Sequence, residues 1–133
     1  MLVGELESRL GGAKTVVLET CKHDGTWVPT PVSVVYEGDH AYFSSFDASG
    51  KFQRIAGHPQ VRLTPASWRG KGLGTVVPCQ ARLLDGDEAE HARRLIAARS
   101  WLVHRLIVPF KRRRTGWRTV HYEVTAADRE PRE

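Results

Sequence analysis

Apolar and polar residues alternate along most of the chain with the short period of β-strands, and a helical period replaces it near the C-terminal end. Stretches rich in β-branched and aromatic residues lie between glycine, proline and aspartate, which form turns. From Asp87 onwards, apolar residues recur at helical spacing as far as Ile107, which indicates one face of a long helix. The pattern therefore predicts a mainly β protein with few helices.

The turn residues set the bounds of the predicted elements. We expect strands over residues 15–21, 27–36, 40–45, 61–66, 75–84 and 117–125. An amphipathic helix is expected over 2–10, a short helix from Gly50, and a long helix that Asp85 or Asp87 caps and Pro109 ends. Asp24 and Gly25 predict a tight hairpin turn between the first two strands.

Six strands with little helical cover have to bury their apolar faces against one another. A small closed or nearly closed barrel does this and leaves few strand edges exposed. With 133 residues, of which 41% are hydrophobic and 26% charged, the chain suffices for one domain over 1–133 with one core. Because side chains fill the interior of a small barrel, we expect a flavin-sized ligand on its outside or at a subunit boundary.

The net charge of +5 is concentrated between Arg93 and Arg118, which predicts an anionic partner. The sequence carries no helix-turn-helix, zinc-finger or RNA-recognition signature. A small molecule that bears phosphate or carboxylate is therefore favoured over nucleic acid, and a small basic nucleic-acid-binding barrel stays open as an alternative.

Targeting and redox signals point to the cytoplasm. No apolar run of about 18 residues, the length of a membrane span, is present, so no membrane partner is expected. Glu5, Glu7 and Arg9 stand where a secretory signal would need an apolar stretch. Cys21 and Cys79 have no partners at ligand spacing, which predicts two reduced strand residues and no metal site.

The best candidate for a binding site follows the third strand, where Ser49 and Gly50 open the short helix. A helix N-terminus offers backbone N–H groups that have no partner within the helix. Lys51 and Arg54, three positions apart, lie on one helical face. This combination suits a phosphate, although the same residues also fit an ordinary solvated helix end with two incidental cations.

Two prolines remove backbone hydrogen-bond donors from the second predicted strand. Pro29 and Pro31 have no N–H to offer a neighbouring strand. The segment is therefore either interrupted at a bulge, where its backbone can face a ligand, or an ordinary edge strand.

Several short motifs, spread from residue 13 to residue 124, resemble those of one known family. The chain is similar to the split-barrel flavin-binding proteins related to pyridoxamine 5′-phosphate oxidase, and more closely to the branch that uses the deazaflavin coenzyme F-420. The resemblance rests on Asp24-Gly25, Pro29-Thr30-Pro31, Tyr42-Phe43-Ser44, Gly50-Lys51, Arg54-Ile55-Ala56, His58-Pro59-Gln60-Val61, Leu63-Thr64-Pro65-Ala66, Arg69-Gly70-Lys71 and residues 81–87. It implies a mainly β, six-stranded split barrel, FMN-binding-like, with one short and one long helix.

The resemblance also implies a homodimer in which the cofactor lies in a groove between two barrels and contacts both. The family's phosphate-binding segment corresponds to Ser49, Gly50, Lys51 and Arg54. The strands beside the cofactor's ring system correspond to Thr30, Pro31, Val32, Ser44 and Ser45.

Basic residues favour the deazaflavin over flavin mononucleotide (FMN), which stays the alternative cofactor. Coenzyme F-420 carries a tail of carboxylates, and residues 111–114, together with Arg69 and Lys71, can pair with it. The run at 111–114 equally suits a solvated helix C-terminus. Trp68, beside Arg69, is the best candidate to stack on the ring.

The function that this resemblance implies is hydride transfer between reduced F-420 and an electron-poor small organic substrate. The cofactor carries such chemistry, so no catalytic residue is named. An FMN-binding protein related to pyridoxamine-phosphate oxidase and a non-catalytic cofactor-binding or haem-binding split barrel are the other readings.

Overall fold

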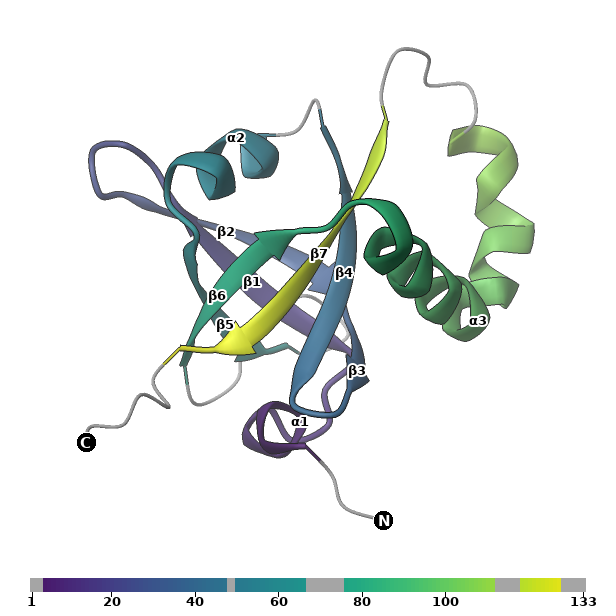
Figure 1. Ribbon diagram of the computed structural model, residues 1–133, viewed down its shortest axis with the longest axis horizontal. Coiled ribbons are helices and arrows are strands. Elements are labelled where there is room, and N and C mark those ends of the chain that lie inside the picture. The colour runs from purple at the N-terminus through teal and green to yellow at the C-terminus, as the bar shows by residue number, and fades with distance from the viewer. Residues whose placement is uncertain (1–3, 48–49, 67–75, 112–117, 128–133) are drawn as a thin grey trace.

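The computed structural model describes residues 4–47, 50–66, 76–111 and 118–127, with side chains in these ranges except those of 100–111. Within them, seven strands form one curled antiparallel sheet, and three helices lie against it (Figure 1). The strands are β1 (Thr15–Cys21), β2 (Trp27–Ser33), β3 (Val35–Glu37), β4 (His40–Phe46), β5 (Gln60–Pro65), β6 (Val77–Leu83) and β7 (Thr119–Ala126). The helices are α1 (Glu5–Arg9), α2 (Gly50–Gly57) and α3 (Gly86–Lys111).

The sheet has to curl because its two edge strands are neighbours in sequence. The strand order is β2-β1-β5-β6-β7-β4-β3, so β2 forms one edge and β3 the other. Val34 alone separates these strands along the chain. The two edges therefore meet where β2 passes into β3, and the sheet becomes a nearly closed barrel.

The passage from β2 to β3 corrects the prediction of one strand over 27–36, and of six strands in all. Val34 is fully buried, and its N–H donates to the carbonyl oxygen of Lys14 at 3.0 Å. Before it the chain pairs with β1, and after it with β4. The residues are β-forming on both sides of Val34, so the change of partner leaves no break in the pattern.

The β1–β2 hairpin was predicted correctly. The chain turns at Asp24 and Gly25, where Gly25 takes a φ of 90° that favours glycine, and the N–H of Lys22 donates to the oxygen of Thr26 at 2.8 Å. β2 pairs with β1 over all seven of its residues, and no other strand in the described part of the chain pairs with its far edge. Of the two readings of Pro29 and Pro31, the edge strand is therefore the observed one.

The long helix continues past the residue expected to end it. α3 runs from Gly86 to Lys111, so Pro109 lies within its last turn. A proline so near the end of a helix removes one backbone hydrogen bond and leaves the earlier turns intact.

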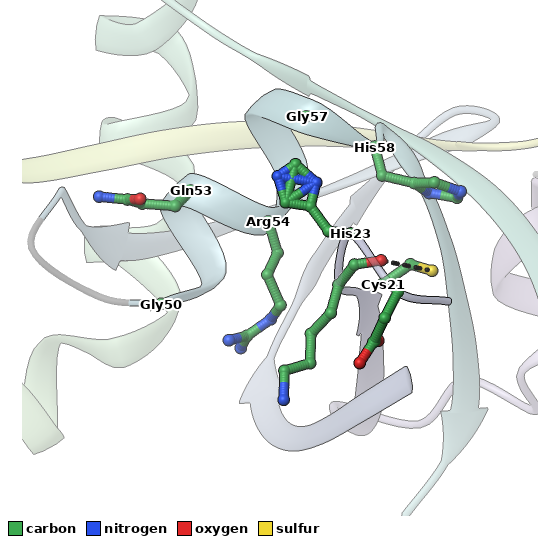
Figure 2. Close-up of a pocket in the computed structure, with 9 residues that line it drawn as sticks. Cys21, His23, Gly50, Gln53, Arg54, Gly57 and His58 are labelled. Atoms are coloured by element: carbon green, nitrogen blue, oxygen red, sulfur yellow. Dashed lines mark hydrogen bonds between the residues drawn. The ribbon is translucent and has the colours of Figure 1, made fainter. Parts of the chain in front are cut away.

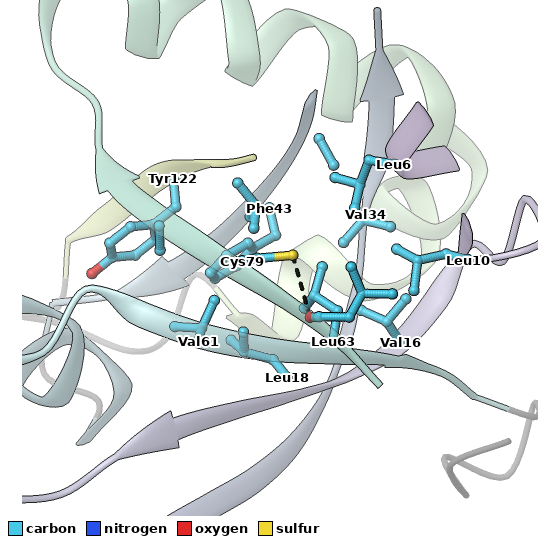
Figure 3. Close-up of a cluster of buried hydrophobic side chains, with 14 of the residues drawn as sticks. Leu6, Leu10, Val16, Leu18, Val34, Phe43, Val61, Leu63, Cys79 and Tyr122 are labelled. Carbon is cyan, nitrogen blue, oxygen red and sulfur yellow. Dashed lines mark hydrogen bonds between the residues drawn. The ribbon is translucent and has the colours of Figure 1, made fainter. Parts of the chain in front are cut away.

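The barrel interior holds the core (Figure 3). Phe43 of β4 and Tyr122 of β7 are opposite each other in register, and their rings stack with centroids 5.0 Å apart. Leu6 and Leu10 of the α1 region close the end of the barrel opposite α2. Burial of these large apolar groups is the main source of stability.

Helix α3 covers the outer face of β4 and β7. Tyr42 and Leu84 pack against Ala92 of α3 in a second buried cluster. Arg82 of β6 joins the helix to the sheet, since its guanidinium pairs with Glu88 at 3.0 Å and with Glu123 at 2.9 Å. These contacts fix the helix on one flank and leave both ends of the barrel clear of it.

We expect Phe43→Ala to lower the free energy of unfolding by about 3–5 kcal/mol, because it removes a fully buried ring from the stack with Tyr122. Urea denaturation followed by circular dichroism measures this. Leu83→Ala is the control, because Leu83 is 49% exposed and its loss should change stability by only about 0.5 kcal/mol. Equal losses for the two variants would contradict the assignment of the core.

Stability should fall as the pH drops from 7.5 to 5. Burial, and next the charge of Arg93, hold the pKa of His121 below its usual value of 6.5, while Glu90 opposes this. As the pH falls, the unfolded chain therefore binds a proton at His121 before the folded chain does. The contribution of neutral His121 to the free energy of unfolding is present above pH 6.5 and is lost below it. In urea denaturation at the two pH values, His121→Gln should reduce the decline, and an unchanged decline would reject this account.

Candidate functional site

A cavity of about 630 Å³ lies between helix α2 and the β1–β2 hairpin (Figure 2). The hairpin and the helix lie side by side at the end of the barrel opposite α1. The lining residues come from these two elements and are Cys21, Lys22, His23, Asp24, Gly50, Gln53, Arg54, Gly57 and His58.

The barrel wall holds Arg54 in a fixed position in this cavity. Its Nε donates to Oγ1 of Thr20 at 2.6 Å. Thr20 is the last inward-facing residue of β1, and its side chain is fully buried. The hydrogen bond therefore fixes the half-buried guanidinium to the rigid sheet, and it also satisfies a polar group in the barrel interior.

Gly50 provides the space that the Arg54 guanidinium occupies. A Cβ at position 50 would lie 2.6 Å from Nη1 of Arg54, too close for the present arrangement. Because α2 begins at Gly50, the guanidinium lies against the first turn of the helix, where backbone N–H groups have no partner within the helix. An anion placed there can meet both the guanidinium and these N–H groups.

Lys51 adds a second cation beside the first. Burial, and then the charge of Arg54, lowers the pKa of the half-buried Lys51 ammonium. Both effects mean that the charged form lacks compensation by a nearby anion. A bound phosphate would supply that compensation, so the residues present fit a phosphate group.

The structure brings together three of the four residues predicted to hold a phosphate. Gly50, Lys51 and Arg54 lie on the first turns of α2. Ser49, Trp68, Arg69 and Lys71 lie outside the described residues, as does the basic run at 112–114, and the side chain of Lys111 is also outside them.

The residues predicted to lie beside the cofactor ring are divided between two faces of the sheet. Thr30 and Val32 are opposite the buried Leu18 and Val16 and face inward, whereas Pro31 is exposed on the outer face. On β4, Ser45 is buried and Ser44 is exposed. These five residues do not line the cavity.

Sequence reasoning missed four residues of the site. Thr20 looked like any β-branched strand residue, and its role depends on a partner 34 positions away. Lys22 and His23 immediately precede the predicted turn, which was the only available signal for them, and the packing of that turn against α2 is tertiary. His58 was part of the motif His58-Pro59-Gln60-Val61 in the family resemblance and had no binding role assigned to it.

The described residues offer neither a metal site nor a membrane-spanning helix. No group of three or more His, Cys, Asp or Glu there could hold a metal ion. No helix in those ranges is long and apolar enough to cross a membrane.

Solved structures with this architecture were compared with the chain. The haem storage protein HutZ from Vibrio cholerae is 12% identical, with a TM-score of 0.64 over 93% of this chain and 89% of that one. A predicted pyridoxamine 5′-phosphate oxidase from Listeria innocua is 16% identical, with a TM-score of 0.57 over 93% and 95% of the two chains. The chain has the split-barrel fold of the pyridoxamine 5′-phosphate oxidase-like proteins.

A third split barrel in the comparison is a reductase that depends on reduced coenzyme F-420, 18% identical with a TM-score of 0.54 over 84% of this chain and 93% of that chain. No family model and no curated protein sequence matches the chain. These split-barrel neighbours differ in what they are described as binding. The comparison therefore establishes the fold, and the ligand has to be argued from the cavity.

We expect Thr20→Val to weaken binding of inorganic phosphate about 2–10-fold, the equivalent of one lost hydrogen bond of about 0.5–1.5 kcal/mol. The variant keeps the shape of the side chain and removes only the atom that fixes Arg54. Isothermal titration calorimetry measures the affinity.

Two further variants test this reading of Thr20. Thr20→Ser should restore phosphate binding, because it returns the hydroxyl group. Thr64→Val, the same change on the outward face of β5, should have no effect on phosphate affinity. If Thr20→Val and Thr64→Val bind phosphate as well as the unchanged protein, the hydroxyl does not position Arg54.

Proposed function

We propose that the protein is a deazaflavin-dependent oxidoreductase, which binds coenzyme F-420 and transfers a hydride between it and an electron-poor small organic substrate. The observation that carries the proposal is the placement of Arg54, fixed by Thr20 and fitted against Gly50 at the start of α2. A cation that the barrel wall fixes beside free helix N–H groups is a suitable anchor for a cofactor phosphate.

The electrostatics favour an anionic group such as phosphate over a neutral ligand. Arg54 offers a planar fork of donors, and Lys51 offers a point charge. Each charge-assisted hydrogen bond contributes about 1.5–3 kcal/mol. Two such contacts, with the N–H groups of the first turn, would make this corner the anchor of the ligand.

The bound deazaflavin would supply the hydride chemistry. The task of the chain is to bind and orient it. Arg54 and Lys51 would fix the phosphate at one end, so that the position of the ring depends on the strands beside α2. The residues that the family resemblance places beside the ring stay part of the proposal. Two of them, Pro31 and Ser44, are exposed.

A second copy of the chain would complete the site, and we propose a homodimer. None of the three described helices covers the outer face of β2, β1 and β5. Trp27 lies on that face, with the guanidinium carbon of Arg62 3.9 Å from its ring centroid. A large aromatic side chain on an uncovered sheet supports a subunit contact there.

The two cysteines agree with a reducing compartment. Cys21 and Cys79 are both buried thiols that form no disulfide. We extend the proposal to a cytoplasmic location on this ground.

FMN is the alternative cofactor, because it shares the phosphate and a tricyclic ring with the deazaflavin. A non-catalytic split barrel that binds a cofactor or haem is a further candidate, and it is supported by the fold shared with the haem storage protein HutZ. Absorbance of the purified protein titrated with F-420, FMN and haem separates the three.

We expect Lys51→Ala and Arg54→Ala each to weaken F-420 binding at least tenfold, since each removes about 1.4 kcal/mol or more of charged contact. Fluorescence titration of the deazaflavin measures this, and wild type should bind F-420 more tightly than FMN. Lys14→Ala and Arg94→Ala are the controls, because they remove exposed charges away from the cavity. Equal affinity of wild type, Lys51→Ala and Arg54→Ala would remove the phosphate assignment.

A further inference from the structure

The cavity beside α2 is larger than one phosphate needs. Its volume of about 630 Å³ falls within the range of about 300–1,000 Å³ that holds whole small ligands. Arg54 and Gly50 occupy one wall, and the β1–β2 hairpin forms the other. A ligand anchored at Arg54 therefore has room to extend toward the hairpin.

Most charged groups around this space are basic. The hairpin contributes Lys22 and His23, both exposed at the cavity, and the end of α2 contributes Arg54 and His58. Among the lining residues that the structure describes, Asp24 alone is acidic, and its Oδ1 accepts the Thr26 N–H of its own hairpin at 2.9 Å. The space beyond the phosphate anchor thus favours further negative charge.

A hydrogen bond to the backbone orients the ring of His58. Nδ1 lies 3.1 Å from the carbonyl oxygen of Gln60, which can only accept, so Nδ1 carries the hydrogen in this contact. Nε2 is then the ring nitrogen left for contact with a ligand. The ring is supported from the side by Trp27, with centroids 5.8 Å apart.

The lining does not suit the aromatic part of a cofactor. None of the nine lining residues in the described part of the chain is Phe, Tyr or Trp. A tricyclic ring placed here would have no aromatic side chain among these residues on which to stack. The polar extension of a ligand fits the space better than its ring.

We infer that the part of this cavity away from the Arg54 guanidinium is a second anion subsite, in which Lys22, His23 and His58 bind an anionic extension of the ligand whose phosphate Arg54 holds. The chemistry shared by the candidate extensions is negative charge, from either a chain of carboxylates or a second phosphate. The inference rests on the proposed phosphate site at Arg54. It assigns the extension to the hairpin rather than to the basic run at 111–114.

Inorganic anions test the subsite without any cofactor. Wild type should bind tripolyphosphate at least tenfold more tightly than orthophosphate, as measured by calorimetry, because only the longer anion reaches both walls. Lys22→Ala and His23→Gln should each reduce tripolyphosphate affinity at least threefold and change orthophosphate affinity less than twofold. Lys14→Ala removes an equal charge from the opposite end of β1 and should change neither.

Cofactor pairs identify the extension. If the extension is a chain of carboxylates, Lys22→Ala and His23→Gln should lose affinity for F-420 and retain it for the same deazaflavin phosphate without its glutamates. If the extension is a second phosphate, the two variants should lose affinity for flavin adenine dinucleotide and retain it for FMN. Equal loss within both pairs, or no loss in either, overturns the subsite.

The outcomes separate this inference from the proposed function. If F-420 binds and Arg54→Ala weakens it, while tripolyphosphate binds no better than orthophosphate, the subsite fails and the function stands. If no deazaflavin or flavin binds, while the hairpin variants lose tripolyphosphate as expected, the redox proposal fails and the subsite stands.

Discussion

Closure of the sheet at Val34 is the constraint on which the rest of the structure depends. One buried residue separates the two edge strands, so the sheet can satisfy its pairing only by curling until these edges meet. Arg99 of α3 donates to the Val34 carbonyl, and Tyr36 donates from its hydroxyl to the oxygen of Ala13 at 2.5 Å, which holds the junction from both sides. Closure brings the ends of β1 and β4 to the same end of the barrel, where α2 and the hairpin form the cavity.

The site is therefore coupled to the register of the barrel. Thr20 reaches Arg54 because it shares the inward face of β1 with Val16 and Leu18, which the core fixes. A slip of one residue would turn Thr20 outward and place Glu19 in the interior, a change that the core would resist. The same packing that stabilises the barrel thus positions the cation, and the cation in turn satisfies a buried hydroxyl.

Local periodicity was enough to predict the parts of the site that lie on one element. Gly50, Lys51 and Arg54 fall on one helical turn, and helix geometry alone brings them together. The hairpin at Gly25 and the ranges of most strands followed from turn residues in the same way. Thr20 and Lys22 could not be assigned, because their importance comes from packing between β1 and α2. The change of partner at Val34 was also hidden, since β-forming residues continue on both sides of it.

The fold and the side chains contribute differently to ligand binding, which explains how one architecture can bind different ligands. The split barrel supplies a closed wall and an end at which a short helix can present its N–H groups. In this chain the specific contribution is the distribution of charge at that end, with fixed Arg54 and half-buried Lys51 on the helix and Lys22 and His23 on the hairpin. Because none of the lining residues that the structure describes is aromatic, a stacking surface for a ring would have to come from outside this lining. The charge at this end of the barrel favours a ligand that carries an anionic group there.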